Sequence, residues 1–171
     1  MNKLKRQQGF SLIELPIVVA IIGIIAAIAI PNLLASRRAA NEGSALASMR
    51  VVFSSEATYQ ATAGAGLYGS LADLRAVGLI DSVLASATAA TQPKSGYVFS
   101  AASVAVAGLP AFDAGSIPSA HTTANPVTGT GTRSFYTNES GVMYFNTGAA
   151  GTAAPTCTAD AARTVTGSVL N

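Results

Sequence analysis

Cysteine, histidine, tryptophan and charge are all scarce in this sequence of 171 residues. The single cysteine, Cys157, excludes an intrachain disulfide, and the single histidine, His121, excludes a histidine-based catalytic triad and a multi-histidine metal site. The acids after residue 70 are scattered and lack the spacing of an EF-hand loop: Asp73, Asp81, Asp113, Glu139 and Asp160. We therefore expect no enzyme, no metal site and no other cofactor.

Basic residues are concentrated at the amino terminus. Lys3, Lys5 and Arg6 are three of the ten basic residues; without them, seven basic residues face eight acidic ones, a net charge of −1 instead of +2. No basic cluster remains that would provide an electrostatic footprint for nucleic acid. We therefore expect no direct nucleic-acid binding.

A long apolar segment follows these charges. Residues 10–30 read FSLIELPIVVAIIGIIAAIAI, and their only clearly polar side chains are Ser11 and Glu14. A helix of this length rises about 1.5 Å per residue and reaches roughly 31 Å, the thickness of a bilayer's hydrocarbon core. The segment is thus long enough to span a membrane, and the positive charges before it place residues 36–171 outside the cytoplasm. A secretory signal peptide would instead end its apolar region at a small-residue cleavage site.

The residues around the start of this segment form a distinctive string. Gly9 precedes Phe10, Glu14 follows four residues later, and Gly23 and Pro31 lie further along the apolar run. The string GFSLIE resembles the processing and methylation signature of type IV pilins and the related pseudopilins, most closely that of a type IVa-type major pilin. The resemblance implies that a membrane peptidase cuts between Gly9 and Phe10 and methylates the new amino group of Phe10. The mature chain would then begin at Phe10.

Glu14 is an energetically costly residue in this setting. A carboxylate at the centre of a membrane helix costs about 2.5–3.5 kcal/mol, so an acid there generally has a partner or a function. One interpretation places Glu14 near the lipid headgroups, where it gains from the helix dipole. The resemblance favours a second, in which Glu14 pairs with the amino terminus of a neighbouring subunit and sets the register of a filament core. A subunit in the wrong register would leave a charge buried and unpaired.

Three residues interrupt this helix-forming run. Proline inside a helix costs about 3 kcal/mol and glycine close to 1 kcal/mol, so Gly23 and Pro31 either kink the helix or, as the resemblance implies, bound a stretch that melts within a filament. Pro16 departs from the large aliphatic residue usual in the family. Either the first turn is extended or the helix begins near Pro16, and both options affect the geometry around Glu14.

The helix is predicted to continue from residue 32 to about residue 61. Five positions recur at three- and four-residue steps and are expected to pack on a sheet: Leu46, Met49, Phe53, Ala57 and Gln60. Ser70 and Asp73 resemble a capping box that opens a short helix over residues 71–77. Residues 79–90 are predicted to form a loop or a weak helix.

Two short motifs are interpreted as turns. Gly64-x-Gly66-x-x-Gly69 has the spacing of a dinucleotide-binding loop, but it follows a long helix where that motif requires a strand. Asn138-Glu139-Ser140 matches an N-glycosylation acceptor, yet it lies in a predicted hairpin turn. Neither motif predicts a site by itself.

The remaining residues show the composition of antiparallel strands. Strands are predicted over residues 97–106, over residues 116–127 with a break at Pro118, and over residues 133–137 and 142–147, which flank a hairpin turn; a short strand is expected within residues 163–169. The predicted fold class is α+β, a type IV pilin-like fold with a long helix packed on three to four antiparallel strands. The chain divides into a leader (1–9), a membrane or filament-core helix (10–31), an amphipathic helix half (32–62), a connecting loop with a short helix (63–95) and a sheet domain with a tail (96–171).

These features predict a structural subunit of a type IV pilus-like filament. It would be made as a single-pass inner-membrane protein with a periplasmic C-terminal domain, and would be extracellular after assembly. The resemblance implies a homo-oligomer that depends on a prepilin peptidase and methyltransferase, an assembly ATPase with its platform protein, and an outer-membrane channel. Adhesion, twitching motility and DNA uptake are outputs of the family. Two alternatives stay open: a pseudopilin of a type II secretion system, and a minor tip subunit that binds a ligand or DNA.

Overall fold

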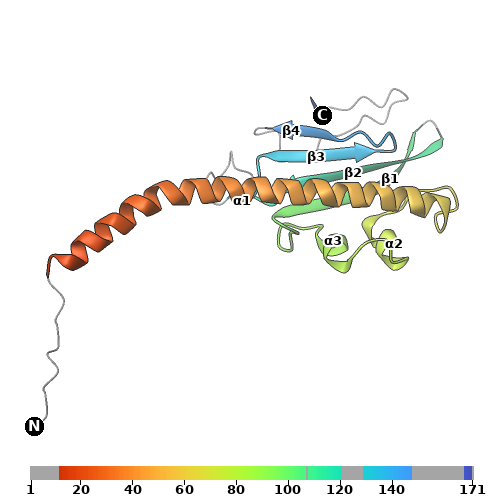
Figure 1. Ribbon diagram of the computed structural model, residues 1–171. Helices are drawn as coiled ribbons and strands as arrows, with labels where there is room; N and C mark the ends of the chain where they lie inside the picture. The colour runs from red at the N-terminus through yellow and green to blue at the C-terminus, as the bar shows by residue number, and fades with distance from the viewer. Residues whose placement is uncertain (1–11, 107, 121–128, 148–167, 171) are drawn as a thin grey trace, which may run out of the picture. The chain divides into compact units, whose positions relative to one another are not determined.

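The computed structural model describes residues 12–106, 108–120, 129–147 and 168–170. The chain divides into two compact units, Met1–Ser36 and Arg37–Asn171, and each is described by itself. Its elements in chain order are α1 (Glu14–Ala61), α2 (Leu71–Ala76), α3 (Ser82–Ser86), β1 (Tyr97–Val106), β2 (Leu109–Pro118), β3 (Arg133–Asn138), β4 (Tyr144–Thr147) and β5 (Ser168–Val169). Figure 1 shows the strands as one sheet, with the second unit's part of α1 along one face. The predicted α+β class is confirmed.

Helix α1 packs on the sheet through a face that differs by about one residue from the predicted stripe. Met49 is fully buried as expected, but its buried neighbours at helical spacing are Ala45, Val52 and Glu56, whereas Ala57 is exposed. The predicted stripe was therefore partly wrong, and it did not include the two acids of the buried face, Glu42 and Glu56. The core below this face includes Leu74, Leu84, Tyr97, Phe99, Phe112 and Phe135.

Glycines at the end of α1 form a turn, as predicted for the Gly64-x-Gly66-x-x-Gly69 motif. The Gly64 N–H donates to the Tyr59 carbonyl at 2.7 Å, and the Gly66 N–H donates to the Gln60 carbonyl at 3.0 Å. Gly66 has φ +92°, a left-handed conformation that glycine adopts without steric cost. No strand precedes this turn in the described residues 12–63, so the motif is a helix terminus.

The short helices α2 and α3 begin at side-chain caps. The Asp73 N–H donates to Ser70 Oγ at 3.3 Å, and the Ser70 N–H donates to Asp73 Oδ2 at 2.8 Å, which completes the predicted capping box. Asp81 caps α3 by accepting from the Leu84 N–H at 2.5 Å. Leu71, Leu74 and Leu84 anchor both helices in the core.

The sheet has five antiparallel strands in the order β1-β2-β3-β4-β5, one more than the upper number predicted. Strand β1 coincides with the prediction, and β3 and β4 form the predicted hairpin. Of the predicted strand over residues 116–127, residues 121–127 lie outside the described residues, and residues 116–118 are the end of a strand that begins earlier, β2. Its continuous register with β1 runs from Tyr97↔Pro118 to Val106↔Leu109, and Gly108 takes φ +78° at the connection. Of the strand predicted within residues 163–169, the described part is β5.

Glu42 ties α1 to the start of β3. Its Oε1 accepts from the Thr132 N–H at 2.8 Å and from Thr132 Oγ1 at 2.6 Å, and its Oε2 pairs with Arg133 Nε at 2.7 Å. Burial opposes ionisation of Glu42, but the hydrogen bonds from Thr132 and the positive charge of Arg133 outweigh it and hold the pKa of the carboxyl below its usual value. The ionised acid thus fixes the helix against the sheet.

Candidate functional site: the apolar amino-terminal half of helix α1

The first part of α1, residues 14–36, presents its apolar side chains to the outside. The large hydrophobic side chains are between 47% and 98% exposed: Leu12, Ile13, Leu15, Ile17, Val18, Val19, Ile21, Ile22, Ile24, Ile25, Ile28, Ile30 and Leu33. An 18-residue window of α1 has a mean hydropathy of 2.7, and none of it is buried. The helix is long and apolar enough to cross a membrane, and an apolar surface of this extent marks an interaction site.

Glu14 is the single charged residue between Leu12 and Ser36. It begins α1 and is exposed, and it has no hydrogen-bond or ion-pair partner among the described residues. The residues of the predicted cleavage and methylation site, Gly9 and Phe10, lie outside the described residues, as do Cys157, His121 and Asp160.

Pro16 lies in the first turn of α1, where the missing N–H is not needed by the helix. The Ile17 N–H donates to the Ile13 carbonyl at 3.4 Å, so hydrogen bonding begins immediately after the proline. Of the two geometries considered for Pro16, the helix start near this residue is the one observed.

Gly23 and Pro31 lie inside a helix that continues through both of them. A Cβ added at Gly23 would meet no heavy atom within 4 Å, so nothing in the described chain requires a glycine there. Next to Pro31, the Asn32 side-chain amide donates to the Ile28 carbonyl at 3.1 Å. Both residues are poor helix formers, and they weaken α1 where they occur.

Basic residues follow the apolar segment. Arg37 is exposed, and Arg38 Nε donates to the Gly129 carbonyl at 3.4 Å. These are the first charged side chains after Glu14, so the apolar stretch is bounded by a charge at each end.

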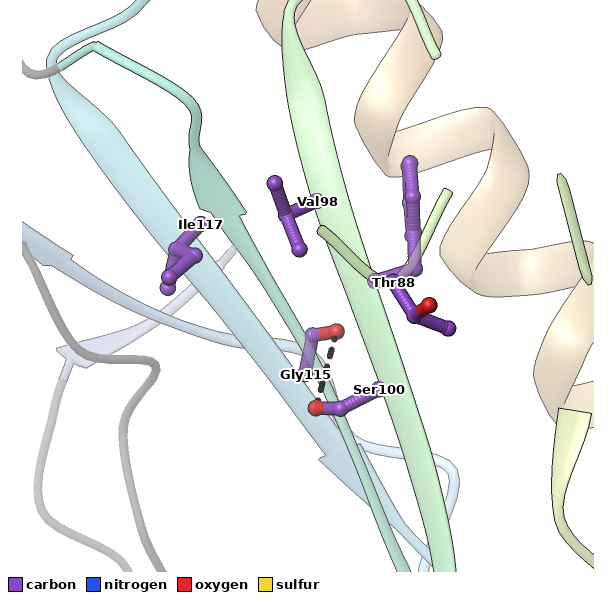
Figure 2. Close-up of a pocket in the computed structure, with 6 residues that line it drawn as sticks. Thr88, Val98, Ser100, Gly115 and Ile117 are labelled. Atoms are coloured by element: carbon purple, nitrogen blue, oxygen red, sulfur yellow. Dashed lines mark hydrogen bonds between the residues drawn. The ribbon is translucent and has the colours of Figure 1, made fainter. Parts of the chain in front are cut away.

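The head unit offers no comparable chemical site among its described residues. No group of three or more His, Cys, Asp or Glu residues is close enough to hold a metal ion there. A hollow of about 250 Å³ lies on β1 and β2, and none of its lining residues is titratable. Figure 2 shows Val98 and Ser100 of β1 beside Ile117 and Gly115 of β2 at this hollow. The hollow therefore lacks groups for acid–base or nucleophilic chemistry.

In the glycosylation-like motif Asn138-Glu139-Ser140, the Asn138 side chain forms hydrogen bonds within the hairpin turn. Asn138 is 4% exposed, and its Oδ1 accepts from the Ser140 N–H at 3.0 Å and from Ser140 Oγ at 2.6 Å. The hairpin turn thus uses the side chain that a glycan would need.

A second buried acid, also absent from the predicted stripe, has unusual surroundings. Glu56 is fully buried; its Oε2 accepts from the Gly69 N–H at 3.0 Å, and its Oε1 has no partner among the described residues. Burial raises the pKa of Glu56, the Gly69 hydrogen bond opposes the rise, and the nearby charge of Asp73 adds to it. The spacing of Glu42, Met49 and Glu56 in steps of seven was the signal that could have placed both acids on the buried face.

The apolar half of α1 carries one acid, and the chain continues into a head of helix and antiparallel sheet, which is the arrangement expected of the predicted type IV pilin-like fold. Comparison with known families gives a match of residues 4–30 to the prokaryotic N-terminal methylation motif. This match and the relatives described below support the resemblance of the amino-terminal residues to type IV pilins.

Two curated relatives match the amino-terminal part of the chain. A type IV wide pilus major component, PilA4 of Thermus thermophilus, is 59% identical over 39 residues, which cover 23% of this chain and 30% of the relative. A type IV major pilin protein, PilA of Myxococcus xanthus, is 43% identical over 54 residues, which cover 32% of this chain and 24% of the relative. No solved structure matches the chain at a significant level. The chain thus spans less than a third of the length of these relatives.

Proposed function

We propose that this chain is a structural subunit of a type IV pilus-like filament and that it assembles through the apolar half of α1. The observation that carries the proposal is an exposed apolar helix whose single acid, Glu14, has no partner among the described residues. Each feature is unfavourable in an isolated chain in water. Both are satisfied when the helices of many copies pack together.

Processing would provide the missing partner of Glu14. The methylation motif covers residues 4–30 and includes Gly9 and Phe10. Cleavage between these two residues would create a methylated, positively charged amino group on Phe10, one helical turn from Glu14. Between neighbouring copies in a water-free core, this amino group and the carboxylate would attract strongly only in the correct register.

The membrane would hold the subunit before assembly. The positive residues Lys3, Lys5 and Arg6 favour the cytoplasmic side, which places the head in the periplasm of a single-pass inner-membrane protein. The proposed partners are a prepilin peptidase and methyltransferase, an assembly ATPase with its platform protein, and an outer-membrane channel. The assembled filament would be extracellular.

The presence of Gly23 and Pro31 supports the proposal that part of α1 loses its helical structure within the filament. Both residues are poor helix formers, and Gly23 has no packing role in the described chain. We place a melting segment between them. It would let the core helices adjust to their neighbours while the heads keep their fold.

Substitution of Glu14 tests the assembly role. Glu14→Ala should leave cleavage intact and reduce sheared filaments by about tenfold or more, because one charge-paired contact per subunit is lost. Asn32→Ala is the matched control, since it removes an exposed polar side chain from the same helix whose recorded bond is to its own carbonyl at position 28. Normal filament yield from Glu14→Ala would disprove the role.

The intact mass of the chain in two cell fractions tests the function as a whole. An abundant sheared species that lacks residues 1–9 and carries one added methyl group would support a pilus subunit. The same processed mass confined to the membrane would indicate a pseudopilin, and a trace species beside another abundant pilin would indicate a minor subunit. An uncut precursor in both fractions would contradict the proposal.

A further inference from the structure

Strand β1 forms one edge of the sheet, and the described residues cover only the first part of this edge. The backbone groups of Tyr97 exchange hydrogen bonds with those of Lys94, at 3.0 and 2.9 Å. Two residues later, the Phe99 N–H donates to the Ala87 carbonyl at 2.7 Å. The loop before β1 therefore satisfies this part of the edge.

The second part of the edge has free backbone groups. In an antiparallel pair, successive residues direct their N–H and C=O groups alternately toward and away from the partner strand. Because the groups of Tyr97 and Phe99 point away from β2, those of Ala101, Ser103 and Ala105 do so as well. None of these three residues has a backbone hydrogen bond on that side among the described residues.

The usual protection of an edge strand is missing here. Natural sheets blunt their edges with charges, prolines or bulges. Residues 97–106 contain no charged residue and no proline, and their register with β2 is continuous, without a bulge. Ser103 and Ala105 are exposed. The edge is therefore open to another strand.

Space is available beside this edge. A hollow of about 410 Å³ lies along it, lined by Ser70, Leu71 and Ala72 at the start of α2, by Ala85 and Thr88, and by Phe99, Ser100 and Ala101. The hollow of about 250 Å³ described above shares Thr88, Phe99 and Ser100 with this one. It lies on β1 and β2, where Ser100 Oγ donates to the Gly115 carbonyl at 3.5 Å (Figure 2). Both hollows have neutral linings, so an approaching strand meets no charged side chain among the lining residues.

We propose that β1 pairs with β1 of a second copy of this chain, antiparallel and centred on Ser103. This register alone places the three outward-facing residues Ala101, Ser103 and Ala105 opposite Ala105, Ser103 and Ala101 of the second copy. The backbone donors and acceptors of both edges are then satisfied, and small uncharged side chains face one another. An edge without charge is complementary to itself, which favours a second copy over a charged peptide.

The symmetry of this contact decides where it acts. Two identical edges in antiparallel pairing are related by a two-fold axis, whereas neighbours along a polar filament use two different surfaces. The β1 contact consequently joins copies that are not neighbours within one filament. It is a lateral contact between filaments, a consequence that rests on the proposed function, while the pairing itself rests on the edge alone.

Disulfide trapping tests the pairing in the full-length chain in detergent, where no filament is needed. In a Cys157→Ser background, Ser103→Cys places two thiols opposite each other across the two-fold axis, at a Cα separation suitable for a disulfide. Val83→Cys, an exposed position on α3, is the matched control. We expect covalent dimers from Ser103→Cys at about ten times the control level at equal protein concentration. Equal levels would overturn the proposal.

Charge substitution tests the register independently. Ser103→Lys alone and Ser103→Glu alone should each abolish pairing, measured by sedimentation, because like charges face each other; an equimolar mixture should restore it. Because the backbone groups of Ser103 point away from β2, the substitutions should leave the hydrogen bonds between β1 and β2 intact, and unchanged thermal unfolding checks this.

Failure of the mixture to pair would overturn the antiparallel register. In cells, filaments that form yet sediment singly, without lateral bundles, would refute the lateral contact while leaving the proposed filament standing.

Discussion

The two halves of helix α1 treat their acids in opposite ways. Glu14, in the first half, is exposed among apolar side chains and has no partner among the described residues. Glu42, in the second half, is buried and holds Thr132 and Arg133 of the head. The first acid thus lacks a partner among the described residues, whereas the second is satisfied by partners within its own unit.

The apolar side chains of the helix follow the same division. Those of residues 12–33 are largely exposed, but Ala45, Met49 and Val52 are buried against the sheet. One continuous helix thus combines an exposed apolar half with a half that is buried against its own head. A change in the first half should affect assembly without affecting the fold, and a change in the second half should do the reverse.

The largest effect in the first half is expected from blocking its processing. Gly9→Val should prevent cleavage almost completely, because the branched side chain replaces the residue at the cleavage position. The uncut precursor should accumulate in the membrane, as intact mass will measure. Thermal unfolding of the head should be unchanged. Gln8→Val is the neighbouring control, and efficient cleavage of Gly9→Val would contradict the assignment of this site.

In the second half, the largest effect is expected from removing the Glu42 carboxylate. Glu42→Ala should destabilise the head by about 2–4 kcal/mol, since it leaves the Thr132 donors and the Arg133 charge without their acceptor. Glu14→Ala, the matched change in the first half, should leave unfolding of the head within about 0.5 kcal/mol of wild type. Near-ultraviolet circular dichroism of the full chain in detergent measures both. If Glu14→Ala and Glu42→Ala destabilised the head equally, the two halves of α1 would not have separate roles in assembly and folding.

The pH dependence of unfolding gives a second measure of Glu42. Its pKa is lower in the folded than in the unfolded state, so its stabilisation is fully present above the unfolded pKa and is lost as the pH falls through the folded pKa. Wild-type unfolding temperature should therefore drop as the solution becomes acidic, and Glu42→Gln should flatten this drop. A parallel curve for the variant would show that Glu42 is not the group responsible.

Sequence reasoning predicted the first half of α1 better than the second. Glu14, Gly23 and Pro31 stand out from an apolar run, because the segment has one composition and few exceptions. In the second half, Glu42 and Glu56 are buried by tertiary contacts with residues 132, 133 and 69, which local periodicity does not contain. Sequence separation from their partners kept these acids out of the predicted core.

The sheet shows the same limit. Strand β1 and the β3–β4 hairpin were predictable from β-forming residues and a turn signal. Strand β2 was missed because Pro110, Gly115 and Pro118 are typical of loops, yet Pro110 pairs with Ala105 near a strand end, where proline is tolerated. Pairing with β1 outweighs the weak strand propensity of this segment.

Glu56 sharpens the contrast with Glu42, since its pKa shifts in the opposite direction. Its folded pKa is raised, so stability associated with its proton is present below the unfolded pKa and is lost as the pH rises through the folded pKa. Glu56→Gln keeps an acceptor for the Gly69 N–H and removes the buried charge. The variant should be more stable than wild type by about 1 kcal/mol at pH 8, and the difference should shrink as the pH falls from the raised folded pKa toward the unfolded pKa of glutamate. A constant difference would exclude ionisation as the cause.

The smallest expected effect comes from replacing one glycine in each half of α1 with alanine. Gly43, on the exposed face of the second half, has no heavy atom within 4 Å of an added Cβ, and the same holds for Gly23 in the first half. Gly43→Ala should stabilise the head by about 0.5–1 kcal/mol through the higher helix propensity of alanine, as thermal unfolding will measure. Gly23→Ala should not change unfolding of the head; its effect should appear in the assembled filament, as greater stiffness under stretching if the segment up to Pro31 melts there. Filaments of wild-type stiffness would show that this glycine acts only as a static interruption of the helix.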